Sequence, residues 1–103
     1  MIIVMVTFKL PVAWSVEEAS KVFEATAPKY LGREGLIRKH YYLIGGGDRA
    51  GGIYLWRSRS DAEACYTLEW QAMVTEKYGA PPEIQYMICP VTVDNIAHRI
   101  ETS

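Results

Sequence analysis

The order of strand-like and helix-like segments most constrains how this sequence can fold. Residues 2–10 are rich in β-branched and aromatic side chains, and no charge occurs before Lys9, which predicts a buried strand. A helix to about residue 27 should follow, because Ser15 and Glu18 have the spacing of a capping box. The first third of the chain therefore predicts one strand followed by one helix.

The rest of the chain extends this order. Four further segments are predicted: strands over residues 36–43 and 52–57, a helix over residues 60–78, and a last strand over residues 83–93. Ser60 and Glu63 repeat the capping-box spacing at the start of the second helix. Pro90 has no N–H to donate to a ladder, so we expect it at an edge or a bend of the last strand.

The complete order is βαββαβ, which is the ferredoxin-like arrangement of an α+β fold. Right-handed crossovers would place both helices on the same face of one antiparallel sheet. A chain of 103 residues, half of them hydrophobic, has room for one core of modest size. We therefore expect a single ferredoxin-like domain over residues 1–103.

The first and third strands are apolar on both of their faces. In the first strand Ile3 and Met5 alternate with Val4 and Val6, and the third strand combines Ile53 and Leu55 with aromatic residues. A sheet with one solvated face would instead alternate apolar and polar residues. The least demanding cover for the second face is the same face of another copy, so the pattern predicts a homodimer.

Charge and cysteine content exclude several classes of function. Eleven basic and twelve acidic residues give no basic excess for nucleic acid. The apolar N-terminus lacks a basic region and a cleavage site and is too short to span a bilayer, so we expect a cytoplasmic protein that binds no membrane. Cys65 and Cys89 lack metal-ligand spacing, and two free thiols are expected rather than a bridge.

Three segments together resemble a known family. They are Gly-Leu-Ile-Arg-Lys at 35–39, Ala-Gly-Gly-Ile-Tyr-Leu-Trp at 50–56, and the helical Ala-Glu-Ala-Cys-Tyr at 62–66. The sequence resembles the YdhR-type monooxygenases. This resemblance implies a dimeric α/β barrel, in which two sheets close face to face. It also implies oxidation of a small aromatic or quinol-like compound by O2, with no metal, flavin or haem as cofactor.

Aromatic residues supply candidate walls for a substrate pocket. The sequence has seven tyrosines and three tryptophans. The candidate substrate-binding residues are Tyr42, Tyr54, Trp56, Tyr66 and Trp70. In the second helix, the i,i+4 spacing of Tyr66 and Trp70 places both rings on one face. The alternative is that these rings only fill the core and the dimer interface, where aromatic residues are common.

His40 and Arg38 are the candidate catalytic residues. The unperturbed pKa of histidine lies close to neutral pH, which suits a general base. Residue alternation predicts that Leu36, Arg38, His40 and Tyr42 share one strand face. Arg38 would then stabilise the phenolate or enolate that the base creates. Alternatively, both charged side chains discourage pairing at an exposed sheet edge.

Three functions are consistent with these features. The resemblance favours a homodimeric, cofactor-independent monooxygenase that acts in aromatic compound metabolism, and the aromatic residues are compatible with it. The first alternative is a dimer of the same fold that binds a small ligand without catalysis, because one fold can carry many functions. The second is a haem-degrading enzyme, which would require an axial ligand such as His40 in the pocket.

Overall fold

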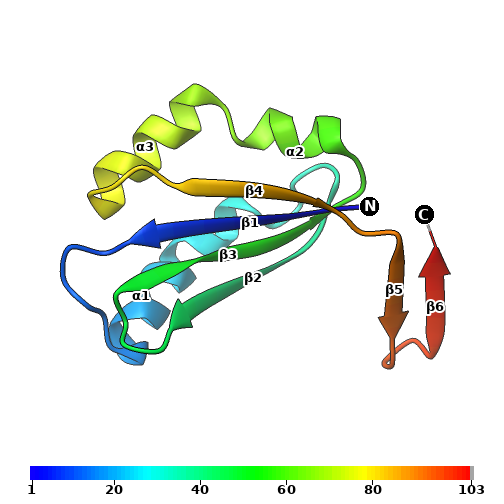
Figure 1. The fold of residues 1–103 in the computed structure, drawn as a ribbon, viewed down its shortest axis with the longest axis horizontal. Helices are drawn as coiled ribbons and strands as arrows, with labels where there is room; N and C mark the ends of the chain where they lie inside the picture. The colour runs from blue at the N-terminus through cyan, green and yellow to red at the C-terminus, as the bar shows by residue number, and fades with distance from the viewer. Residues whose placement is uncertain (103) are drawn as a thin grey trace.

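The computed structural model of the protein describes residues 1–102 (Figure 1). Its elements in chain order are β1 (Ile2–Lys9), α1 (Val16–Thr26), the short 3-10 helix η1 (Ala27–Lys29), β2 (Leu36–Ile44), β3 (Arg49–Trp56), α2 (Arg59–Cys65), α3 (Leu68–Tyr78), β4 (Glu83–Ile88), β5 (Val91–Asp94) and β6 (Arg99–Thr102). The α+β ferredoxin-like fold predicted from the sequence is confirmed, with two additions: the second helix is divided, and a short hairpin follows β4.

The main sheet has four antiparallel strands in the order β2-β3-β1-β4. The first strand lies in the centre, where it pairs with β3 over its whole length and with β4 from Ile2 to Thr7. The helices cover one face of this sheet (Figure 1). The opposite face is open, because no described element packs across it.

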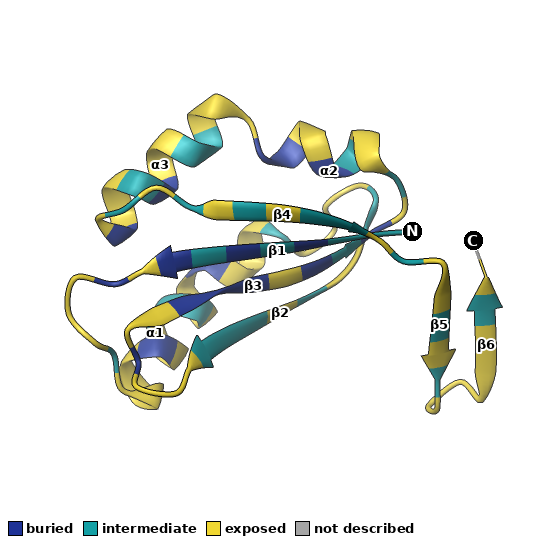
Figure 2. Ribbon diagram, viewed as in Figure 1, coloured by how far each residue is buried: buried dark blue, intermediate teal, exposed yellow. Residues whose placement is uncertain are grey.

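The core lies between the covered face of the sheet and the helices. Val4, Val6 and Trp56 are the largest fully buried side chains, and they pack with Ala62 of α2 and Val74 of α3. Their alternation along β1 and β3 fixes which side of each strand faces the helices. Figure 2 shows that burial is concentrated in these central strands and on the inner sides of the helices.

The predicted single helix over residues 60–78 is two helices, α2 and α3. Tyr66 leaves the helical conformation, and the side chain of Thr67 caps the new N-terminus by accepting a hydrogen bond from the backbone N–H of Trp70. The sequence prediction missed this break because apolar and aromatic residues keep helical spacing on both sides of it. The break turns the chain so that both short helices contact the same sheet face.

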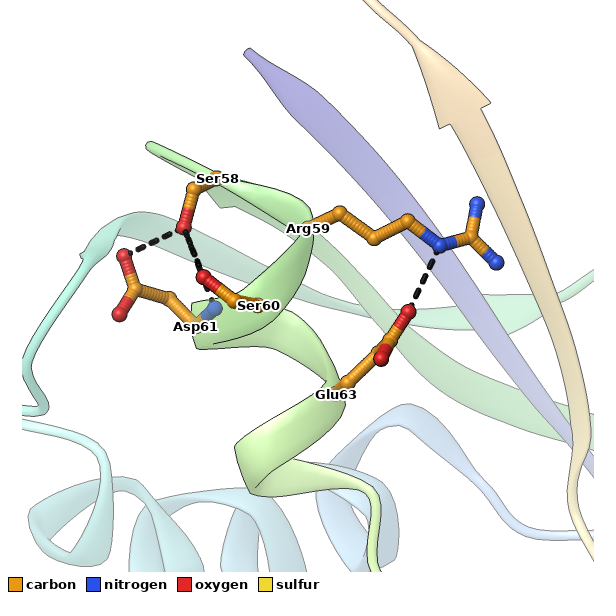
Figure 3. Close-up of polar contacts among 5 residues, drawn as sticks. All are labelled: Ser58, Arg59, Ser60, Asp61 and Glu63. Atoms are coloured by element: carbon orange, nitrogen blue, oxygen red, sulfur yellow. Dashed lines mark hydrogen bonds and ion pairs between the residues drawn. The ribbon is translucent and has the colours of Figure 1, made fainter.

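The N-terminus of α2 also differs from the prediction. Its cap is Ser58 rather than Ser60: the Ser58 hydroxyl accepts from the backbone N–H of Asp61 and donates to the Asp61 carboxylate at 2.8 Å (Figure 3). On the same helix, Arg59 and Glu63 form an exposed ion pair of 2.8 Å. By contrast, both hydrogen bonds of the capping box predicted at Ser15 and Glu18 of α1 are present, each 3.1 Å long.

The predicted last strand over residues 83–93 is interrupted. Pro90 lies between β4 and β5, at the bend expected from its missing N–H. After the bend, β5 and β6 form a two-stranded hairpin that stands away from the main sheet (Figure 1). The apolar side chains of Val91, Val93 and Ile100 are exposed on it.

Among the described residues, none of the helices combines the length and the apolar character that a membrane span requires.

Candidate functional site

A cleft lies between the covered face of the sheet and helices α1 and α3. Its free volume is about 30 Å³, so its own side chains nearly fill it. Its lining is Phe8, Phe23, Thr26, Lys29, Tyr30, Lys39, Tyr41, Gly51, Gly52, Tyr54, Trp70, Met73, Val74, Lys77 and Tyr78. The walls are therefore mainly aromatic, and the charged groups that line the cleft are three lysines.

Lys39 is the central polar group of this cleft. It lies on β2, and its ammonium nitrogen is 3.6 Å from the ring centre of Tyr30, 3.8 Å from that of Tyr41 and 4.5 Å from that of Tyr54. Within residues 1–102 the ion pairs are Arg59–Glu63 and Arg99–Glu101, so no carboxylate is paired with Lys39. Three aromatic faces take the place of a counter-ion, and such faces attract a cation.

Burial changes the acidity of Lys39. Removal of the amine from water lowers its pKa from 10.5 to about 7, and the neighbouring Cys65 opposes this fall only in part. At neutral pH a large fraction of Lys39 therefore carries no charge and can accept a proton. An ordinary surface lysine has almost no neutral form at this pH.

Glycine on the neighbouring strand makes room for this lysine. Gly52 of β3 lies beside Lys39, and a Cβ atom at position 52 would come within 2.9 Å of Lys39 Cε and 3.0 Å of the Tyr54 ring. The side chain of Lys39 can lie across the sheet because Gly52 has none. The glycine pair at 51 and 52 is thus part of the cleft, in addition to following the hairpin turn.

The tyrosine and tryptophan side chains around the cleft are held by hydrogen bonds. Tyr41 O–H donates to Thr26 Oγ1 at 2.7 Å, since the Thr26 hydroxyl donates to the carbonyl of Phe23. Trp70 Nε1 donates to the Tyr30 hydroxyl at 3.1 Å. These bonds connect α1, α3 and the sheet, so the aromatic walls hold defined orientations.

Burial also fixes the protonation of the tyrosines. It raises the pKa of Tyr54 and of Tyr41 above the usual value, and it raises the pKa of Tyr78 to about 12. All three phenols remain protonated at neutral pH and can act only as neutral donors or acceptors. Lys39 is consequently the group in the cleft that is best suited to take up a proton.

The structure brings together four of the aromatic residues predicted to bind substrate. Tyr54, Trp56, Tyr66 and Trp70 all lie on the covered side of the sheet, and the Tyr66 ring centre is 5.2 Å from that of Tyr54 and 5.0 Å from that of Trp70. Tyr54 and Trp70 line the cleft. Trp56 and Tyr66 lie behind them in the core, where Trp56 Nε1 donates to the Tyr66 hydroxyl at 3.0 Å.

Arg38, His40 and Tyr42 lie on the open face of the sheet, away from this cleft. Arg38 and His40 are exposed and border a shallow hollow with Ile53 and Val93. The prediction that these three residues share one strand face agrees with the structure. The prediction that they form one site with the aromatic residues of β3 and α3 does not. The sheet separates the two groups.

Leu36 departs from the predicted alternation. A β-bulge at Ile37 shifts the register, so that Leu36 pairs with Trp56 while Arg38 pairs with Leu55. The extra residue reverses the side on which Leu36 lies, and Leu36 packs against the core. It therefore does not share a face with Arg38.

Tyr42 is the predicted pocket residue with the most clearly structural contacts. Its hydroxyl donates to the carbonyl of Val6 at 2.9 Å and accepts from the Thr7 hydroxyl. The missing side chain of Gly51 leaves space for it, because a Cβ atom there would come within 2.8 Å of the Tyr42 oxygen. Tyr42 thus joins β2 to β1 across β3.

Sequence reasoning missed Lys39 and Tyr30 as site residues. Alternation along the strand puts Lys39 on the face opposite His40, and a base was sought on the histidine side. One signal could have found it: Lys39 is a lone lysine among the apolar and aromatic residues that alternate with Arg38 and His40. Tyr30 follows η1 in a loop, where residue spacing gives no information about which way a ring points.

The structure also bears on haem and metal binding. His40, the axial ligand that haem degradation would require, does not line the aromatic cleft. In the part of the chain that the structure describes, no three side chains of His, Cys, Asp or Glu are close enough together to hold a metal ion. The Cys65 thiol is free and buried, so it forms no bridge with Cys89.

Comparison with known proteins adds a likeness in fold. No family profile matches the sequence, and no curated protein matches it. The structure is similar to a monooxygenase from the gene ActVA-Orf6 of Streptomyces coelicolor, solved with the ligand nanaomycin D, at TM-score 0.64 and 14% identity over 85% of this chain and 86% of that chain. It is also similar to SnoaB, a cofactor-independent oxygenase from Streptomyces nogalater, at TM-score 0.62 and 15% identity over 89% and 95%.

A third similar structure comes from Deinococcus radiodurans, a protein named as a candidate antibiotic biosynthesis monooxygenase, at TM-score 0.65 and 11% identity over 91% of this chain and 97% of that chain. At these identities the likeness shows the fold alone. The chain shares its ferredoxin-like fold with these three proteins. Membership of the YdhR-type family stays a prediction.

Proposed function

We propose that this chain is a monooxygenase that oxidises a small phenolic or quinol-like aromatic compound with O2 and without a bound cofactor. The observation that carries the proposal is Lys39, a partly buried amine with a pKa of about 7 among aromatic walls. The likeness in fold to a protein named as a cofactor-independent oxygenase supports the same reaction class. The reaction would take place in the cleft between the sheet and the helices.

In the proposed reaction Lys39 acts twice. The neutral amine takes the phenolic proton of the substrate, and the resulting ammonium then lies beside the phenolate and stabilises it. The aromatic side chains of Tyr54 and Trp70 would pack against the substrate ring and exclude water from the ion pair. To admit the ring, the flexible side chains of Lys39 and Met73 would move aside.

The substrate itself supplies the electrons for oxygen. The phenolate transfers one electron to O2, and the radical and superoxide combine to form a carbon–oxygen bond as a peroxide. The peroxide O–O bond then breaks, leaving one oxygen on the ring carbon as a carbonyl group. The second oxygen leaves as water with two hydrogens from the substrate. A phenol thus becomes a quinone with no external reductant.

We also propose that two copies of the chain associate through the open sheet face, as the sequence pattern predicts. Ile3, Met5, Ile53 and Leu55 lie on that face, and Ile53 is 39% exposed in the single chain. The part of this face that β1 and β3 form is apolar, and no described element covers it, which favours a second copy as its cover. The exposed apolar residues of β5 and β6 are a further surface that a second copy would bury.

Oxygen uptake tests the proposed reaction. The uptake rate should be measured with a panel of hydroquinones and anthrone-like compounds, with the uptake in buffer alone subtracted. The wild-type protein should exceed the buffer rate, and Lys39→Met should lower kcat by about 100-fold or more, because a positioned base contributes about 10²- to 10⁴-fold. The wild-type rate should rise as the pH passes about 7, where Lys39 loses its proton, and this inflection should be absent from Lys39→Met.

The matched control is His40→Ala, which removes the other candidate base on the same strand. Its rate should remain close to the wild-type rate, because His40 lies on the open face. A large loss in His40→Ala with an unchanged Lys39→Met would move the site to the open face and contradict the cleft. Binding of aromatic compounds with no uptake above buffer would favour the alternative of a non-catalytic ligand binder.

A further inference from the structure

The charge of the cleft differs from the charge of the whole chain. The chain has a formal net charge of -1, from eleven basic and twelve acidic residues. The cleft is lined by Lys29, Lys39 and Lys77, and neither aspartate nor glutamate lines it. A cleft that is cationic in a slightly acidic chain attracts anions by its own local field.

The three lysines occupy different depths of the cleft. Lys39 is partly buried among the tyrosine rings, whereas Lys29 of η1 and Lys77 of α3 are exposed. No ion pair neutralises any of them among the described residues. An aromatic ligand could therefore place its ring against the walls while an acidic substituent meets the two outer lysines.

We propose that this cleft selects aromatic compounds that carry an anionic substituent, such as a carboxylate, over neutral compounds of the same shape. The inference rests on the proposed function, because it assumes that this cleft is the substrate site. It adds the chemical class of the substrate. The ring would contact Tyr54 and Trp70, and the anionic group would lie at the mouth near Lys29 and Lys77. Opposite charges at the mouth give orientation and selectivity, while the rings contribute the apolar contact.

A pair of matched ligands tests this selectivity. Binding of 2-naphthoate and of 2-naphthamide should be compared by isothermal titration calorimetry, because the two share a ring system and neither is a quinol. The carboxylate should bind about tenfold more tightly than the amide at low salt. This ratio should fall as the salt concentration rises, since the outer lysines are exposed.

Charge-matched variants locate the effect. The double variant Lys29→Gln/Lys77→Gln should lose most of the preference for the carboxylate. The double variant Lys9→Gln/Lys21→Gln removes the same charge from exposed positions that do not line the cleft. It should keep the preference.

Several results would overturn the inference. Equal affinity for the two ligands, no binding of either, or a preference that survives in Lys29→Gln/Lys77→Gln would each contradict it. These outcomes are separate from failure of the proposed function. If the protein takes up oxygen with neutral quinols but binds the two naphthalene ligands equally, only the inference is contradicted. If it prefers the carboxylate but shows no oxygen uptake, only the monooxygenase proposal is contradicted.

Discussion

The two faces of the sheet place neighbouring basic residues of one strand in opposite surroundings. On β2, Lys39 points to the helix-covered face, lies among three tyrosine rings and has a pKa of about 7. Arg38 and His40, on either side of it in sequence, are exposed on the open face. Burial against helices, rather than residue type, makes Lys39 the stronger candidate for proton transfer.

The faces also differ in how they are stabilised. The covered face holds the core, with Val4, Val6 and Trp56 removed from solvent. The open face keeps apolar side chains in partial contact with water and contains the Tyr42 hydrogen bonds as its main polar contacts. The covered face should therefore determine the stability of the single chain, whereas the open face should determine its association.

The largest expected effect is on the covered face. Trp56→Ala should lower the free energy of unfolding by about 3–5 kcal/mol, because it leaves a large cavity and removes the partner of the Tyr66 hydroxyl. The control Ile44→Ala, at the end of β2 where the side chain is 40% exposed, should cost much less. Urea titration followed by circular dichroism measures both, and equal losses would contradict the assignment of the core to one face.

The next effect concerns the open face. Ile53→Lys should weaken association of two chains by about 3 kcal/mol, because it would bury an unpaired charge between the sheets. Light scattering at micromolar concentration should give a dimer mass for the wild type and a monomer mass for the variant. Leu68→Lys, on an 83% exposed residue of α3, should remain dimeric. A monomeric wild type would contradict the proposed dimer directly.

The sequence predicted the fold better than the site. The order of strands and helices along the chain and the Ser15 capping box follow from local residue types and spacings, and both are confirmed. The break at Tyr66 and Thr67 was missed, because a threonine cap within a run of helical spacing gives a weak local signal. The cap at Ser58 was missed because Ser60, two residues later, has the capping-box spacing to Glu63 and was the stronger local signal.

The site was harder to predict because both phases of the strands are apolar or aromatic. Alternation places Lys39 and His40 on opposite sides of the strand, but it does not tell which of the two residues points toward the helices. That assignment depends on long-range packing, with Trp56 against α2 and the Tyr30 ring over Lys39. The preference for histidine as a base rested on its unperturbed pKa, whereas burial shifts the pKa of Lys39 into the same range.

The smallest expected effect tests the polar contact of the open face. Tyr42→Phe removes the hydroxyl that joins Thr7 and the Val6 carbonyl and should lower the free energy of unfolding by about 1 kcal/mol, the usual net contribution of such hydrogen bonds. The matched variant Tyr41→Phe removes the hydroxyl bonded to Thr26 on the covered face.

Oxygen uptake distinguishes the two tyrosines, because Tyr41 lines the cleft and Tyr42 does not. A kcat that falls in Tyr42→Phe and not in Tyr41→Phe would place the reaction on the open face, with Arg38 and His40.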